Sequence, residues 1–192
     1  MIAIIKYNAG NIRSVQNALN RIGYESIITD DPEEIRSAEK VIFPGVGEAS
    51  TTMKYLKEKG LNQLIPTLSQ PVLGICLGLQ LMCSYSEEGD TTCLGIFEEN
   101  VKRFPEKDII PQMGWNNFIE TEGTLLNGIN EKDDVYFVHS YYAELGPNTI
   151  GQTNYILPFS SVMQKGNFYA TQFHPEKSAL VGEKILRNFL AL

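Results

Sequence analysis

The sequence has few of the residues on which several functions depend. Its 192 residues include two histidines, three cysteines and one tryptophan, and 23 acidic against 16 basic residues give a net charge of −7. No run rich in lysine and arginine is present, so nucleic-acid binding is not expected. The apolar residues at 1–6 are far too few for a signal peptide or a membrane span. We therefore expect a cytoplasmic protein that binds neither nucleic acid nor a membrane.

The cysteines and histidines are also poorly placed for a metal site. Six and nine residues separate Cys76, Cys83 and Cys93, whereas zinc sites use short C-x₂₋₄-C spacings, and the two histidines form no H-x₃₋₅-H pair. An odd number of cysteines without a framework spacing is typical of a reducing cytoplasm. We expect neither a metal nor another cofactor.

Strand-like and helix-like segments alternate in the first half of the chain. Strands are predicted at 2–6, 26–28, 40–43 and 71–75, with apolar residues at helical spacing between the first two. Asp31 before Pro32, with Glu34 at the third helical position, predicts a capped helix start. Strands separated by single helices indicate a parallel sheet covered on both faces. The sequence thus predicts a flavodoxin-like, open and mostly parallel α/β sheet.

Beyond about residue 95 the pattern becomes rich in β-structure. Strands are predicted at 101–104, 115–119, 135–138, 151–154, 161–164 and 168–173, the last two joined by a turn at 165–167. A final helix is predicted to place Leu180, Ile185, Leu186, Phe189 and Leu190 against the rest of the molecule. We expect residues 1–192 to form one domain, with ligands binding beyond the carboxyl ends of the strands.

Cys76 is the first candidate for chemistry. It stands between the predicted strand at 71–75 and a predicted helix that begins near Gly78. Gly74 and Gly78 leave room for a sharp turn that would hold the thiol above the sheet, as in a G-x-S-x-G elbow. The positive end of the helix would favour a thiolate, and the N–H of Leu77 would be free to bind an oxyanion. The alternative is a small buried hydrophobic residue, the interpretation that we keep for the other two cysteines.

His174 and Glu176 complete a possible triad. Pro175 disfavours helix at His174, and in an extended chain residues i and i+2 share a face, so the carboxylate would hold the imidazole in one tautomer. A nucleophile, a base and an orienting carboxylate are sufficient for covalent amide hydrolysis. His139 is the one other available base, and a simple surface turn at 174–176 is the alternative interpretation.

A glycine-containing loop follows the third predicted strand. The segment 44–48 lacks the residues of a dinucleotide fingerprint or of a phosphate loop, since Ser50 stands where the fingerprint needs glycine or alanine. We interpret Gly45 and Gly47 as the ends of a flexible peptide whose N–H, at Val46 or Gly47, is a second oxyanion donor. A tight strand-to-helix turn is the alternative.

These residues together resemble the class I (triad-type) glutamine amidotransferases across essentially the whole chain. The resemblance is carried by residues 74–80 around Cys76 and by 174–176, and it is nearest to the glutaminase subunits of imidazole glycerol phosphate synthase through segments 10–15, 44–47, 113–116 and 139–141. One departure is Asn8, where that family usually has glycine after the tyrosine.

The resemblance implies a role for each matching residue. Cys76 would attack the side-chain amide of glutamine, His174 would move protons and Glu176 would orient it, while water would release glutamate from the thioester. The residues implied to bind glutamine are Gly47, Gln80, Glu88, His139, Ser140 and Tyr141. For Ser140 and Tyr141, ordinary packing at a strand end is an equal alternative.

The resemblance also implies a partner for the ammonia. Because the sequence ends directly after its last predicted helix, we expect a separate cyclase subunit. In the resembling family this partner is a (β/α)₈ barrel, which would receive ammonia through a channel for histidine biosynthesis. The residues that match interface or gating positions are Asn11, Trp115, Asn116, Tyr136 and Lys177; Trp115 could equally be a core residue. Three other functions are retained: an amidotransferase subunit for another synthase, such as one that forms an amidino sugar, a stand-alone cysteine hydrolase, and an inactive flavodoxin-like binding module.

Overall fold

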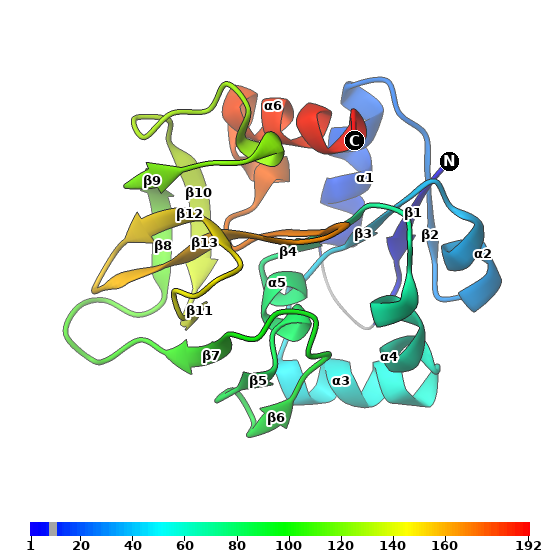
Figure 1. Ribbon diagram of the computed structural model, residues 1–192, viewed down its shortest axis with the longest axis horizontal. Helices are drawn as coiled ribbons and strands as arrows, with labels where there is room; N and C mark the ends of the chain where they lie inside the picture. The colour runs from blue at the N-terminus through cyan, green and yellow to red at the C-terminus, as the bar shows by residue number, and fades with distance from the viewer. Residues whose placement is uncertain (8–10) are drawn as a thin grey trace.

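The computed structural model describes residues 1–7 and 11–192 of the chain, so the departure at Asn8 lies outside the described residues. A parallel sheet with helices on both faces crosses one half of the molecule (Figure 1). Its strand order is β2-β1-β3-β4-β14, and all neighbours in this part are parallel. The strands are β1 (Ile2–Ile5), β2 (Ser26–Thr29), β3 (Lys40–Phe43), β4 (Val72–Ile75) and β14 (Phe168–Thr171). The expected open α/β sheet is therefore confirmed.

Alternate side chains of the strands enter two apolar cores, one on each face of the sheet. On β1, Ile2 and Ile4 belong to one core, and Ala3 and Ile5 belong to the other, because successive side chains of a strand point to opposite faces. Figure 1 shows the helices of the first core above the sheet and those of the second below it. They are α1 (Ile12–Arg21) and α6 (Ala179–Leu190) above, and α3 (Ala49–Glu58), α4 (Leu61–Leu64) and α5 (Leu77–Met82) below.

The short helix α2 (Pro32–Ser37) begins as the sequence predicts. One carboxylate oxygen of Asp31 accepts hydrogen bonds from the backbone N–H groups of Glu33 and Glu34, at 2.8 and 3.2 Å. Pro32 occupies the first helical position, where a missing N–H costs nothing. No helix among the described residues has the length and apolar character needed to cross a bilayer.

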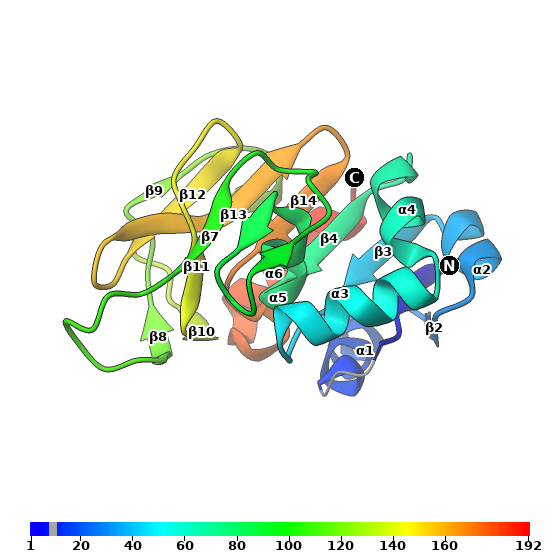
Figure 2. The same ribbon diagram turned by 90° about the horizontal axis from the view of Figure 1, so that it is seen from below.

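Further strands extend the sheet beyond β14, as Figure 2 shows, and all of their pairings are antiparallel except that of β5 with β7. The order continues β13-β11-β7-β5-β6, β12 and β9 pair beside β13, and β8 and β10 form a separate two-stranded sheet. These strands are β5 (Tyr85–Ser86), β6 (Thr91–Thr92), β7 (Asn100–Arg103), β8 (Gln112–Asn116), β9 (Glu120–Thr121), β10 (Val135–His139), β11 (Tyr141–Ala143), β12 (Thr149–Asn154) and β13 (Pro158–Lys165). Short 3₁₀ helices occur at η1 (Ile65–Thr67), η2 (Thr124–Leu126) and η3 (Pro175–Lys177).

Two sequence predictions about this half are corrected. The predicted strand 115–119 is wrong in its bounds, since β8 begins at Gln112, which pairs with His139, and ends at Asn116. Phe118 leaves the strand and enters the core. Leu180 was expected to pack inward with the rest of α6, but its exposed fraction is 81% because it lies in the first turn, away from the sheet-facing side that carries Ile185 and Phe189.

The strand order brings three distant parts of the chain to one edge. β3, β4 and β14 are parallel neighbours, so their carboxyl ends lie side by side. The glycine loop follows β3, Cys76 follows β4, and His174 follows β14 closely. The expected meeting of these three segments is thus a consequence of the topology.

Candidate active site

Cys76 occupies a strained turn between β4 and α5. Its backbone has φ 53° and ψ −106°, a conformation that non-glycine residues rarely adopt and that costs about 1–3 kcal/mol. The surroundings hold it there: its N–H donates to the carbonyl oxygen of Thr171 at 2.7 Å, and its own carbonyl oxygen accepts from the N–H of Gln80 at 3.2 Å. The expected elbow is confirmed, and its strain resides on Cys76 itself.

The two flanking glycines serve close packing. A Cβ on Gly78 would lie 2.0 Å from the carbonyl oxygen of Phe43, and one on Gly74 would lie 2.8 Å from the sulfur of Met82. Neither glycine has a positive φ. They let α5 lie directly against β3 and β4, which places the first N–H groups of α5 beside the thiol.

His174 and Glu176 form the expected pair, by a different geometry from the one predicted. His174 Nδ1 lies 2.8 Å from Glu176 Oε1, and both side chains are almost completely buried. The extended-chain explanation is wrong, because only His174 is extended (φ −98°, ψ 97°) and Glu176 lies in η3. The turn of η3 folds the carboxylate back under the imidazole.

The electrostatics of His174 favour its charged form. Burial alone would lower the pKa of His174, but the nearby sulfur of Cys76 and the carboxylate of Glu176 together raise it to about 10. Its Nε2 has no hydrogen-bond partner among the described residues. The imidazole therefore keeps one ring nitrogen free for proton transfer, and its charged form is the state that the neighbouring groups stabilise.

Asn11 also reaches the triad. Its Nδ2 donates to Glu176 Oε1 at 2.7 Å, the same oxygen that faces His174. Asn11 is the N-cap of α1 and has a left-handed backbone, φ 70°. A residue that the resemblance places at a partner interface thus directly positions the carboxylate of the triad.

A cavity of about 310 Å³ opens beside Cys76. This volume is at the lower end of the range for small-molecule sites. The predicted oxyanion and glutamine-binding residues all contribute to its wall, which consists of Val46, Gly47, Cys76, Leu77, Gln80, Glu88, Pro111, Val138, His139, Ser140 and Tyr141. The structure therefore brings together residues selected from separate segments of the sequence.

The two glycines of the loop after β3 have different functions. A Cβ on Gly45 would lie 2.5 Å from the backbone nitrogen of Gly78, so Gly45 permits close contact with α5 and is not a flexible joint as expected. Gly47 has φ 144°, a backbone conformation that side chains oppose. Only Gly47 has the conformational freedom proposed for this loop.

Two of the predicted glutamine-binding side chains are held by internal hydrogen bonds. Gln80 donates through Nε2 to the carbonyl oxygen of Tyr141 at 2.9 Å and to Gln172 Oε1 at 3.1 Å. His139 donates through Nδ1–H to the same Tyr141 oxygen at 2.7 Å, and its Nε2 lies 2.9 Å from the side-chain amide of Gln112. Both side chains line the cavity and both fix the backbone carbonyl group of Tyr141.

His139 is also excluded as the base. Burial lowers the pKa of His139 to about 4, with the hydrogen bond to Tyr141 opposing and His174 adding to the effect. It is neutral at pH 7 and packs against Phe104, Phe137 and Phe159. Of the two histidines, only His174 has a free ring nitrogen and a carboxylate partner.

The lowered pKa of His139 predicts an acid-sensitive fold. The unfolded chain binds a proton near pH 6.5 and the folded one near pH 4, so this contribution to stability is complete above pH 6.5 and is lost as pH falls toward 4. Between pH 7 and pH 5 the free energy of unfolding should fall by about 2 kcal/mol more in the wild type than in His139→Gln. Urea unfolding at both pH values measures this difference. An equal change in the free energy of unfolding between pH 7 and pH 5 in the two proteins would contradict the lowered pKa of His139.

Glu88 supplies a carboxylate to the cavity wall. It is half-buried, and Oε2 accepts from the N–H of Ala49 at 2.9 Å. Burial raises its pKa, the hydrogen bond from Ala49 lowers it, and the nearby carboxylate of Glu48 raises it again. A cationic group bound in the cavity would compensate that unfavourable environment.

The residues expected at a partner interface differ in their exposure and contacts. Trp115 is 56% exposed, so the core alternative is wrong, and its ring meets Tyr136 edge to face at 5.8 Å. The carbonyl oxygen of Tyr136 accepts from the N–H of His174, at 2.9 Å. Lys177 is exposed directly after Glu176, and Asn116 is partly buried with Nδ2 bonded to the carbonyl oxygen of Asn154.

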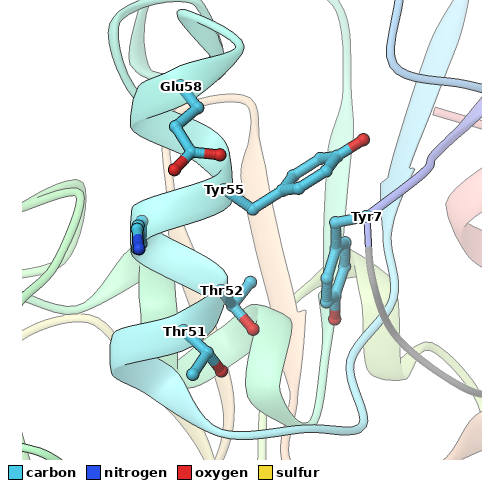
Figure 3. Close-up of a pocket in the computed structure, with 6 residues that line it drawn as sticks. Tyr7, Thr51, Thr52, Tyr55 and Glu58 are labelled. Carbon is cyan, nitrogen blue, oxygen red and sulfur yellow. The ribbon is translucent and has the colours of Figure 1, made fainter.

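A second hollow, of about 410 Å³, lies between the end of β1 and α3 (Figure 3). Tyr7 and Tyr55 both line it, with their hydroxyl groups pointing in different directions, and Tyr7 donates a hydrogen bond to the carbonyl oxygen of Pro44. Burial raises the pKa of Tyr7 far above 10, and the Cys76 sulfur adds to this. None of the predicted site residues lines this hollow.

Sequence reasoning missed Gln172, which is completely buried and donates through Nε2 to the Cys76 sulfur at 3.6 Å. A glutamine near the end of a largely apolar predicted strand, two residues before His174, is the sequence signal that could have found it, because a buried amide needs hydrogen-bond partners. Pro111 and Val138 of the cavity wall were also missed, and no feature of their sequence surroundings marks them.

Comparison with known proteins agrees with this geometry. The chain matches the family model for glutamine amidotransferase class-I over residues 3–192. A putative component of GMP synthase from Thermoplasma acidophilum superimposes with a TM-score of 0.76 at 19% identity, covering 100% of this chain and 92% of that one. At that identity the superposition shows a shared fold. The chain belongs to the class I glutamine amidotransferase family.

Two full-length relatives of this chain share one name. The chain is 58% identical to imidazole glycerol phosphate synthase subunit HisH of Bacteroides thetaiotaomicron, covering 100% of this chain and 99% of that protein. It is 50% identical to the protein of the same name from Blochmanniella floridana, again over 100% of this chain and 99% of the relative. The chain is similar to both of these proteins along its whole length.

Proposed function

We propose that this protein is the glutaminase subunit of an imidazole glycerol phosphate synthase, releasing ammonia from glutamine for a synthase partner. The observation that carries the proposal is Cys76, strained on its turn, facing a small cavity and next to the buried pair of His174 and Glu176. The names of the full-length relatives support the choice of this synthase over one that forms an amidino sugar.

The three triad residues act as nucleophile, proton carrier and orienting carboxylate in the proposed reaction. The Cys76 thiolate attacks the side-chain amide carbon of glutamine, and the imidazolium of His174 gives its proton to the departing ammonia. His174 then takes a proton from the water that attacks the thioester, and glutamate leaves as the thiol is restored. Glu176 and Asn11 keep the imidazole oriented throughout.

The tetrahedral oxyanion has donors on two elements. Leu77 is the first residue of α5, so its N–H has no partner within the helix. The Val46–Gly47 peptide lies across the cavity in the loop after β3, and Gly47 gives it freedom to turn. Reorientation of this peptide is the proposed point at which a partner controls the rate.

We propose that glutamine binds in this cavity with its α-ammonium group at Glu88 and its α-carboxylate at backbone N–H groups of Gly47, Ser140 and Tyr141. That these residues all line the cavity supports the proposal. Gln80 and His139 contribute by fixing the Tyr141 carbonyl. In this proposal four of the predicted glutamine-binding residues contact the substrate, and Gln80 and His139 keep the backbone at Tyr141 in position.

The proposed partner is a (β/α)₈-barrel cyclase, docked on the surface of Asn11, Trp115, Asn116, Tyr136 and Lys177. An exposed tryptophan beside a tyrosine is a common centre of binding energy in protein interfaces. The cyclase would use the ammonia on a phosphoribulosyl formimino aminoimidazole carboxamide ribonucleotide. Three free cysteines support a cytoplasmic location for this complex.

Reconstitution tests the proposal. Glutamate release should be slow in the isolated protein, and it should rise by at least about tenfold with a candidate cyclase and its acceptor substrate. Trp115→Ala should reduce that stimulation, whereas Tyr24→Ala, which removes an exposed ring at the amino ends of the strands, should not. A fast rate that is independent of the partner would instead support a stand-alone hydrolase.

A further inference from the structure

A chain of buried amides ends on the nucleophilic sulfur. Gln80 Nε2 donates to Gln172 Oε1 at 3.1 Å, and Gln172 Nε2 donates to Cys76 Sγ at 3.6 Å. The Gln172 side chain is completely buried and that of Gln80 nearly so. Gln172 belongs to the segment that carries the base, since it lies two residues before His174.

The direction of the chain is fixed at its far end. The backbone carbonyl oxygen of Tyr141 is an acceptor only, so the group of Gln80 that faces it must be the NH₂. That NH₂ turns its second hydrogen to Gln172, which must then present its oxygen. The Gln172 NH₂ is left facing the sulfur, where it can donate but cannot accept.

The second sulfur neighbour has the opposite polarity. The carbonyl oxygen of Val138 lies 3.9 Å from Cys76 Sγ and can only accept. A neutral thiol can therefore donate its proton toward Val138, while a thiolate gains from the Gln172 NH₂. The Val138 carbonyl group can therefore bind only the thiol, whereas the Gln172 NH₂ binds the thiolate more strongly than the thiol.

We propose that Gln172 is a thiolate-stabilising residue, and that Gln80 acts as a positioning residue by fixing the direction of the Gln172 amide. The inference deepens the proposed glutaminase function and rests on Cys76 being its nucleophile. It assigns to Gln80 an effect on the sulfur that does not require contact with glutamine.

Alkylation of Cys76 by iodoacetamide as a function of pH tests this in the full chain without glutamine. The Cys93→Ser background leaves Cys76 and the fully buried Cys83 as thiols. The alkylation rate of Cys76 at pH 7 should fall about tenfold in Gln172→Met, because the thiolate loses the hydrogen bond that favours it. Gln80→Met should slow the alkylation as well, by less.

Gln112→Met is the matched control. Gln112 is a buried glutamine whose amide faces His139 and not the sulfur, so its loss should leave the alkylation profile unchanged. An unchanged profile in Gln172→Met, or an equal shift in Gln112→Met, would overturn the inference.

The outcome is separable from the proposed function. If Cys76→Ala still hydrolysed glutamine, the glutaminase assignment would fail whatever the alkylation profile. If Gln172→Met lost activity with an unshifted acid limb of kcat against pH, Gln172 would have only a structural role and the inference would fail while the glutaminase assignment stood.

Discussion

Replacing Cys76 with alanine is expected to abolish glutamine hydrolysis, lowering kcat by at least about 10³-fold, because removing the nucleophile removes the covalent pathway. The protein should remain folded, since Cys76 contributes little apolar volume and the strained turn is held by hydrogen bonds of its backbone. Glutamate release and the circular dichroism spectrum, measured together, check both parts of the expectation.

Cys93→Ser is the control for this loss. Burial raises the pKa of Cys93 to about 12, with Glu88 adding to the rise and Lys57 opposing it, so this thiol is not a nucleophile at neutral pH. Its replacement should leave the rate within about twofold of the wild type. Full activity in Cys76→Ala, or its loss in Cys93→Ser alone, would refute the assignment of the nucleophile.

The second large effect concerns Gly182 in α6, remote from the chemistry. Replacing a glycine inside a helix with alanine ordinarily stabilises it by about 0.5–1 kcal/mol. Here a Cβ would lie 1.9 Å from the carbonyl oxygen of Pro175, which belongs to the turn that carries Glu176. Gly182→Ala should therefore destabilise the fold by about 3 kcal/mol or more, because a backbone atom and not a flexible side chain must move.

Urea unfolding measures this effect, and Glu183→Ala is the matched control on the same helix. Glu183 makes only an exposed ion pair with Arg187, so its loss should change the free energy of unfolding by about 0.5 kcal/mol at most. Folded Gly182→Ala protein should also lose glutaminase activity, since the displaced η3 carries the triad carboxylate. An unchanged or higher stability would show that α6 does not hold η3 in place.

Much of the site followed from sequence because its residues lie next to regular elements. Cys76 after an apolar strand, and a glycine loop after another, predicted ligand binding at the carboxyl edge of a parallel sheet. The pairing of β14 with β4, which brings His174 to Cys76, depends on contacts between residues almost a hundred positions apart. The sequence proposed that these side chains meet, but it did not predict the strand pairing that brings them together.

The remaining features depend on local packing that spacing does not reveal. Glu176 reaches His174 through a 3₁₀ turn and not along an extended chain, and Asn11 reaches the same carboxylate from the start of α1. Gly45, Gly74 and Gly78 are required by contacts between elements, whereas sequence reasoning assigned them to flexibility and turning. The amide direction of Gln172 is set by a backbone carbonyl elsewhere in the chain.

Covalent labelling by a glutamine-like diazoketone, followed by mass spectrometry of the peptides, tests the central claim most directly. A single adduct should form on Cys76, in proportion to the loss of glutaminase activity, and glutamine should protect against it. His174→Ala should slow the labelling without moving it to another residue. An adduct on Cys93, or complete loss of activity with Cys76 unmodified, would contradict the account.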